Sequence, residues 1–162
     1  MQEDELMLAR RVEDLRKPDR MTDCLVWLLV GNEIGHPYSA RGSTPMRPKE
    51  IVKGRWFGSA LEKYPEDLEV VASDWRVPTF TVSQDAASMT IPNDVGHVLW
   101  NPIGKKPSSS MQISGFWTEY SMGCNTACAV LAAALRARHA MKQLGHAIES
   151  QDDLARLETL WR

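Results

Sequence analysis

The sequence predicts one domain of the α/β (α+β) class, spanning residues 1–162, in which helices pack on a small, mainly antiparallel sheet. Its length of 162 residues is that of one ordinary domain, and 43% hydrophobic with 25% charged residues is typical of a globular chain. Helical periodicity at both ends of the chain flanks short β-rich segments in its second half, which indicates a mixed class.

The first thirty residues predict two helices. Residues 3–17 place apolar side chains at intervals of three and four among charged ones, which is typical of an amphipathic helix, and Pro18 ends it. Asp19 is suited to cap a second helix at residues 19–30, which closes at Gly31.

Residues 31–76 show no regular periodicity and are rich in glycine and proline. Loops of this length are uncommon inside a compact domain, and those that are ordered tend to carry function. We therefore expect a long inserted loop that folds over the domain and forms a pocket for negative charge.

The middle of the chain predicts the sheet. Residues 80–82 are β-rich, and Ser83 is suited to cap a short helix that follows. Two strands are predicted at residues 97–100 and 111–120, with residues 104–110 as the loop between them. Because these strands follow each other closely, we expect them to pair antiparallel.

Two further helices are predicted near the C-terminus. Residues 127–144 carry one apolar stripe, with basic side chains toward the end where the helix dipole favours positive charge. Residues 150–162 predict a short helix capped by Ser150, whose apolar side chains either dock on the same chain or contact a second copy, and we expect a homo-oligomer. These side chains are Leu154, Leu157, Leu160 and Trp161.

Charge and hydropathy exclude several classes of protein. The formal net charge of −2 mixes both signs, which is unlike a binder of duplex nucleic acid. The longest apolar stretch, residues 24–30, is too short to cross a bilayer, and the acidic start is unlike a secretory signal. We therefore expect a cytoplasmic protein without a membrane partner.

The three cysteines predict reduced thiols that pack as small hydrophobic groups. Cys124 and Cys128 have a spacing that could contribute to a metal site, but no further ligand follows nearby. We predict neither a metal site nor a cofactor.

Parts of the chain resemble a known family. Pro78 to Ala87, Ala132 to Ala137 and the helix start at Pro18 are similar to the phage ABA sandwich domain, over residues 18–30 and 77–143. The resemblance implies a helix-sheet-helix sandwich and a phage or prophage origin, hence the host cytoplasm, and it supplies no catalytic residues.

The basic insertion is the main candidate site. Arg47, Lys49, Lys53 and Arg55 lie beside Trp56, which combines donors for phosphate with a ring on which a base can stack. The alternative is a solvated loop whose aromatic side chains anchor it to the core.

Asn125 and Thr126 form a second candidate site, because the free N–H groups of a helix N-terminus attract an anion. The alternative is simple capping of the helix by one of these side chains.

Three functions follow as hypotheses. The first is a non-catalytic phage protein that sequesters a small anionic ligand, as a sponge for a cyclic nucleotide signal of bacterial immunity. The second is an enzyme that degrades such a nucleotide, with His36, His97 or Glu119 as acid or base. The third is a structural or interaction protein of the phage that uses its C-terminal helix and tryptophans as an interface. We favour the first, because no nucleophile stands in a recognisable catalytic motif.

Overall fold

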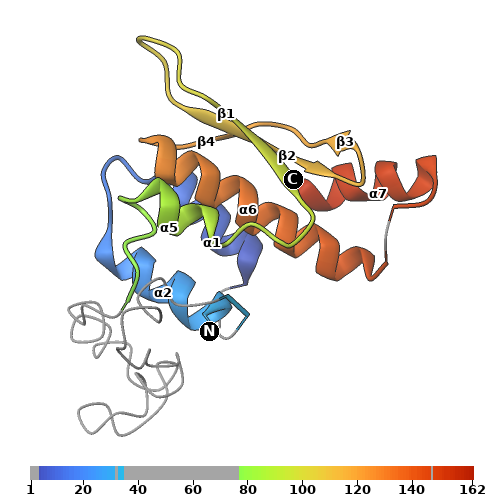
Figure 1. Cartoon of the computed structure of the whole chain (residues 1–162), viewed down its shortest axis with the longest axis horizontal. Coiled ribbons are helices and arrows are strands. Elements are labelled where there is room, and N and C mark those ends of the chain that lie inside the picture. The colour runs from blue at the N-terminus through green and yellow to red at the C-terminus, as the bar shows by residue number, and fades with distance from the viewer. Residues whose placement is uncertain (1–3, 32, 35–76, 147) are drawn as a thin grey trace, which may run out of the picture.

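The structure, a computed structural model, describes residues 4–31, 33–34, 77–146 and 148–162. Within these ranges the chain forms five helices and a four-stranded antiparallel sheet, which confirms the mixed α+β class (Figure 1). The predicted insertion at residues 31–76 lies, apart from its first few residues, outside the described ranges.

Helices α1 (Glu5–Asp14) and α2 (Arg20–Val30) form the N-terminal part of the domain. Asp19 caps α2 as predicted, because its carboxylate accepts the N–H of Thr22 (3.0 Å). Both helices bury an apolar side; the buried hydrophobic residues are Leu8, Ala9, Val12, Cys24, Val26, Trp27 and Val30.

The β-rich residues 80–82 form a turn and not a strand. The N–H groups of Val82 and Ser83 both donate to the carbonyl of Thr79 (3.1 and 2.8 Å), and Phe80 is fully buried. The backbone N–H and carbonyl of Thr81 bond to the side chains of Asp23 in α2 and Asn125 at the start of α6 (Thr126–Leu144), where a strand residue would bond to a neighbouring strand. These bonds explain why β-rich residues adopt a turn here. Ser83 then caps α5 (Gln84–Ser88) as predicted.

The sheet is built around strand β2 (Ser108–Ile113). Strand β1 (Gly96–Trp100) pairs antiparallel along one side of β2, which confirms the predicted pairing. Strands β3 (Phe116–Trp117) and β4 (Ser121–Met122) pair in turn along its other side.

The single long strand predicted at residues 111–120 is wrong. The chain reverses at Ser114 and Gly115, which both have positive φ (50° and 85°), as a two-residue hairpin turn requires. The aromatic residues that follow therefore lie on a separate strand beside β2 and do not extend it.

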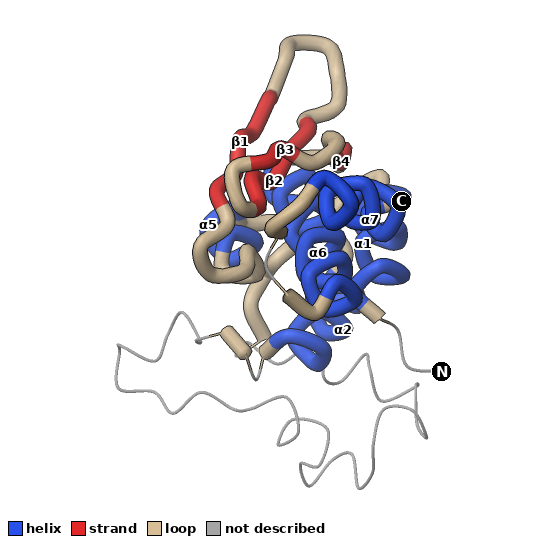
Figure 2. Tube along the Cα trace, turned by 90° about the vertical axis from the view of Figure 1, so that its right-hand side faces the viewer, coloured by secondary structure: helices blue, strands red, loops and turns tan. Residues whose placement is uncertain are grey.

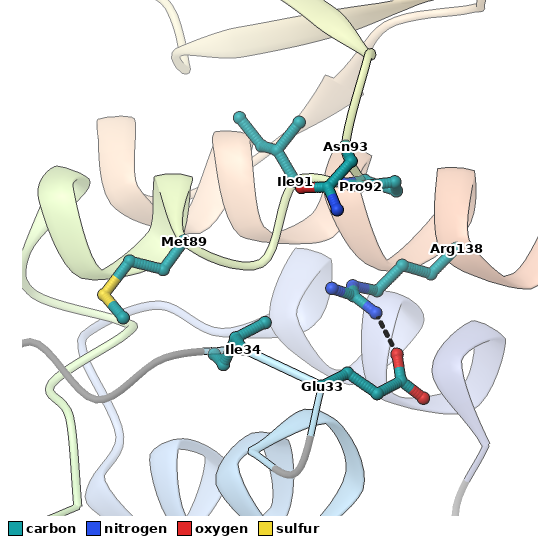
Figure 3. Close-up of a pocket in the computed structure, with 7 residues that line it drawn as sticks. All are labelled: Glu33, Ile34, Met89, Ile91, Pro92, Asn93 and Arg138. Atoms are coloured by element: carbon teal, nitrogen blue, oxygen red, sulfur yellow. Dashed lines mark hydrogen bonds and ion pairs between the residues drawn. The ribbon is translucent and has the colours of Figure 1, made fainter.

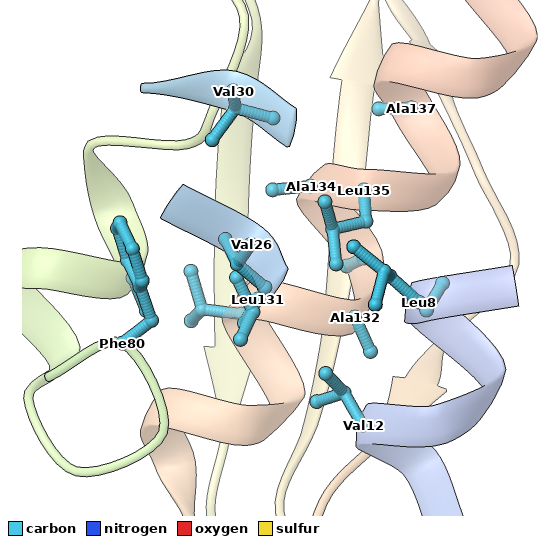
Figure 4. Packing of buried hydrophobic residues seen from close by; sticks show 14 of the residues in the cluster. Leu8, Val12, Val26, Val30, Phe80, Leu131, Ala132, Ala134, Leu135 and Ala137 are labelled. Carbon is cyan, nitrogen blue, oxygen red and sulfur yellow. The ribbon is translucent and has the colours of Figure 1, made fainter. Parts of the chain in front are cut away.

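Helix α6 (Thr126–Leu144) is the centre of the molecule. The sheet lies on one side of it and α1 and α2 lie on the other, and none of the described helices covers the face of the sheet turned away from α6, which we call its open face (Figures 1 and 2). The sequence predicted one apolar stripe along this helix. In the structure residues 127–138 of α6 are all buried, so this part of the helix is covered on every side. In Figure 4, Leu131 and Leu135 of α6 lie between Val26 of α2 and Leu8 of α1.

Helix α7 (Gln151–Trp161) begins at its predicted cap, Ser150, and packs on α6 of the same chain. Leu157 and Trp161 are 2% and 3% exposed, and Leu154 and Leu160 are partly buried against the same core, so α7 docks its apolar side in cis. None of the helices in the described ranges has the length and apolar character needed to span a membrane.

Candidate functional site

The main predicted site residues, Arg47, Lys49, Lys53, Arg55 and Trp56, lie outside the described ranges. Their joint role in a pocket for negative charge stays a prediction.

At the second predicted site, the side chain of Asn125 is used within the protein. Its Oδ1 accepts the N–H of Cys128 (2.8 Å) and its Nδ2 donates to the carbonyl of Thr81 (2.9 Å). The alternative interpretation, simple helix capping, is therefore confirmed for Asn125, whereas Thr126 is the half-buried first residue of α6.

The open face of the sheet carries a cluster of exposed apolar side chains, which we call the aromatic face. Cross-strand pairing aligns Trp100, Ser108 and Met122 in one row and Gln112 with Trp117 in another, all on the side away from α6. The exposed apolar members of the aromatic face are Val98, Trp100, Trp117, Tyr120 and Met122.

Two aromatic rings span the central strand on this face. The ring of Trp100 in β1 meets that of Tyr120, which lies on the other side of β2, in an edge-to-face contact with centroids 6.4 Å apart. Between them β2 presents the small side chains of Ser108 and Ser110, and Ser110 is only 1% exposed. Small residues on the central strand thus leave room for large rings from both edges.

Sequence reasoning missed the aromatic face because it treated residues 111–120 as one strand. The signal that could have found it is the alternation in β1, where Val98 and Trp100 share one side and His97 and Leu99 the other, together with the Ser114–Gly115 turn. With that turn in place, Trp117 falls on the same side as Trp100.

A separate cavity of about 510 Å³ lies beside the start of the predicted insertion (Figure 3). Ile34 and the segment that follows α5 (Met89, Ile91 and Pro92) form its apolar wall. Its polar groups belong to Glu33, Asn93 and Arg138. The lining residues are Glu33, Ile34, Met89, Ile91, Pro92, Asn93 and Arg138.

Arg138 is the main polar group of this cavity. Its side chain is 9% exposed, its Nε donates to the carbonyl of Thr90 (2.5 Å), and its Nη1 donates to the carboxylate of Glu33. The remaining nitrogen, Nη2, makes no hydrogen bond within the described part of the chain, and the guanidinium points between Ile34 and Asn93 (Figure 3). Both N–H groups of Nη2 are thus available for a ligand.

The residues suggested for catalysis do not come together. Oε1 of Glu119 pairs with Arg162 (2.8 Å), exposed His97 makes no hydrogen bond to a described side chain, and His36 lies outside the described ranges. Nor do His, Cys, Asp and Glu residues in these ranges gather into a group of three or more that could hold a metal ion.

Comparison with known proteins adds no relative: no family model, curated protein or solved structure matches this chain. The resemblance to the phage ABA sandwich domain therefore stays a prediction.

Proposed function

We propose that this protein acts by binding, without catalysis, and that it docks a partner protein on the aromatic face. The observation that carries the proposal is the concentration of exposed large apolar side chains on the open side of the sheet. The exposed fractions of Trp100, Trp117, Tyr120 and Met122 are 62%, 52%, 53% and 57%.

The size of this surface favours an interface. A fully exposed aromatic side chain presents about 150–250 Å², so the three half-exposed rings of Trp100, Trp117 and Tyr120 present roughly 300 Å² before Met122 and Val98 are added. Monomeric proteins seldom expose more than a few hundred Å² of contiguous apolar surface, and a larger patch usually marks an interaction site. Tryptophan and tyrosine are also the residues that most often dominate binding energy in interfaces.

The shape of the surface favours a macromolecule over a small ligand. Small-ligand sites are concave and cover most of the ligand, whereas this face is the outer side of a four-stranded sheet. A protein with a complementary apolar patch could cover both tryptophans at once. Given the phage origin that the resemblance implies, host defence proteins and other phage proteins are the first partners to test.

Site-specific photo-crosslinking in cells tests the proposal. A photoreactive phenylalanine analogue in place of Trp117 should give a discrete crosslinked product, and the same analogue in place of Val82 should not. Val82 is the matched control, because it is 61% exposed but lies on the turn before α5. Adding Trp100→Ser should abolish the product of the Trp117 probe, and an unchanged product would refute the proposal.

A second candidate function, the capture of a small anionic ligand, is favoured by the cavity at Arg138. Its volume of about 510 Å³ is in the ordinary range for ligand sites, and the donor left on Arg138 suits a phosphate or carboxylate. The apolar side chains of Met89 and Ile91 suit a base or another flat group.

Equilibrium dialysis with a panel of cyclic nucleotides tests this candidate. Intact ligand recovered after denaturing the protein supports sequestration, new products support the degrading enzyme, and no binding across the panel removes both. Arg138→Lys should weaken any binding at least tenfold, since lysine cannot serve Thr90, Glu33 and a ligand together. Exposed Arg16 provides the control substitution, Arg16→Lys.

A further inference from the structure

Two thiols at the start of α6 lie within bonding reach of each other. The Sγ atoms of Cys124 and Cys128 are 3.7 Å apart. A disulfide has a bond length of about 2.05 Å, so the sulfurs must approach by only about 1.7 Å. Cys124 precedes the first turn of α6, where side-chain rotation can supply this movement without unwinding the helix.

The two thiols differ in their access to solvent. Cys124 is half-buried, whereas Cys128 and the third cysteine, Cys24, are fully buried. A dissolved reagent therefore reaches Cys124 first. Burial and the neighbouring Cys124 sulfur raise the pKa of the Cys128 thiol, so Cys128 holds its proton at neutral pH.

From this geometry we infer that Cys124 and Cys128 are a thiol–disulfide exchange site whose substrate is a disulfide, with Cys124 as the attacking thiol and Cys128 as the resolving thiol. Cys124 gives its proton to water, and its thiolate attacks one sulfur of the substrate disulfide; this breaks the substrate S–S bond, forms a mixed disulfide and releases the first substrate sulfur as a thiolate, which takes up a proton. Cys128 then gives its proton to water and attacks the Cys124 sulfur, which closes the intramolecular disulfide and releases the second substrate sulfur as a thiolate that is protonated in turn. Two cysteine thiols are oxidised and one disulfide is reduced to two thiols.

The surrounding contacts allow this reaction without loss of the fold. The Sγ of Cys128 donates a weak hydrogen bond to the carbonyl of Thr81 (3.6 Å), which oxidation removes. The same carbonyl keeps its stronger bond from Nδ2 of Asn125 (2.9 Å), so the turn stays attached to α6.

Oxidation of the native full-length protein by glutathione disulfide tests the inference. After alkylation of free thiols and digestion with trypsin, Cys124 and Cys128 fall in one peptide that ends at Arg136, and Cys24 falls in another. We expect the first peptide to carry no alkyl group and to be two hydrogens lighter than its free-thiol form, while Cys24 becomes fully alkylated once the chain is denatured. Alkylation of all three cysteines after this treatment would overturn the inference.

Two variants separate the roles of the thiols. Cys128→Ser should stop at a stable glutathione adduct on Cys124, because the resolving thiol is missing. Cys124→Ser should form neither adduct nor disulfide and serves as the matched control. A stable glutathione adduct in the unaltered protein would also contradict the inference, since it would show that Cys128 cannot reach the mixed disulfide.

Discussion

Arg136 and Glu13 form a two-pronged ion pair between the central helix α6 and the first helix α1. Nε and Nη2 of the guanidinium donate to the two carboxylate oxygens at 2.8 and 2.9 Å, and Nη1 donates to the backbone carbonyl of Trp161 in α7. Arg136 is 9% exposed. A single buried side chain therefore joins the middle of the fold to both ends of the chain.

Replacing Arg136 with methionine should lower the free energy of unfolding by about 3 kcal/mol, because the largely buried Glu13 carboxylate loses its counter-charge. Urea denaturation followed by circular dichroism measures this change. Arg16→Met, on the exposed side of the same region, is the control and should change stability little. Equal effects of the two substitutions would show that the ion pair contributes nothing.

Gly123 packs directly against the backbone of α6. A Cβ atom at this position would lie 2.3 Å from the backbone nitrogen of Ala129, so Gly123→Ala should destabilise the fold by about 3 kcal/mol. Gly104→Ala is the comparison, because Gly104 has open space around it and only its positive φ (75°) to disturb, at about 1 kcal/mol. Thermal unfolding of both variants measures the two losses of stability. A larger loss for Gly104→Ala than for Gly123→Ala would show that Gly123 does not pack tightly on α6.

Two tryptophans test whether α7 docks in cis. Trp161→Ala removes a ring that is 3% exposed and should cost about 3 to 5 kcal/mol of unfolding free energy, whereas Trp100→Ala removes one that is 62% exposed and should cost far less. The loss at Trp161 should not depend on protein concentration when α7 packs on its own chain. A loss that shrinks on dilution would instead indicate α7 binding to a second copy, because the parent then gives up the stability that association supplies.

Asp23 should make the protein less stable as pH rises. Burial raises the pKa of this carboxyl above 3.8, against the hydrogen bonds from Thr81 and Arg20 that lower it. The folded state then holds the proton more tightly than the unfolded chain, so the free energy of unfolding falls from about pH 3.8 up to the raised pKa. Asp23→Asn removes this fall, which urea titrations at several pH values can measure.

Asp19, four residues earlier, should act in the opposite direction. Burial is opposed here by hydrogen bonds from Thr22 and by the charge of Arg11, which together lower the pKa of Asp19 below 3.8. Its contribution to stability is complete above pH 3.8 and is lost as pH falls through the lowered pKa. The free energy of unfolding of Asp19→Asn should therefore fall furthest below that of the parent protein at neutral pH. If Asp19→Asn and Asp23→Asn showed the same dependence on pH, the opposite pKa shifts of the two carboxyls would be contradicted.

Local signals in the sequence were sufficient for most helix starts. Asp19, Ser83, Asn125 and Ser150 each cap the helix that the sequence places after them, because capping depends on a side chain and on N–H groups two or three residues away. The antiparallel hairpin of β1 and β2 followed from short sequence separation in the same way.

Features that depend on tertiary partners could not be predicted. Thr81 reads as a strand residue, yet its N–H donates to the carboxylate of Asp23 (2.7 Å) and its carbonyl accepts from Asn125, partners that the fold brings from both sides. Likewise, the tryptophans of the aromatic face look like core residues in a sequence, and only the strand register places Trp100 and Trp117 on the open side.

The burial of α6 also constrains how this chain can change. Seven of its alanines are at most 1% exposed, so each stands where a larger side chain would press on the sheet or on another helix. They are Ala127, Ala129, Ala132, Ala133, Ala134, Ala137 and Ala140. On most helices substitutions on the buried side must keep an apolar residue, whereas substitutions on the exposed side are tolerated. Between residues 127 and 138 of α6 the limit is side-chain volume in every direction, so an enlargement there requires a compensating reduction in the element it faces.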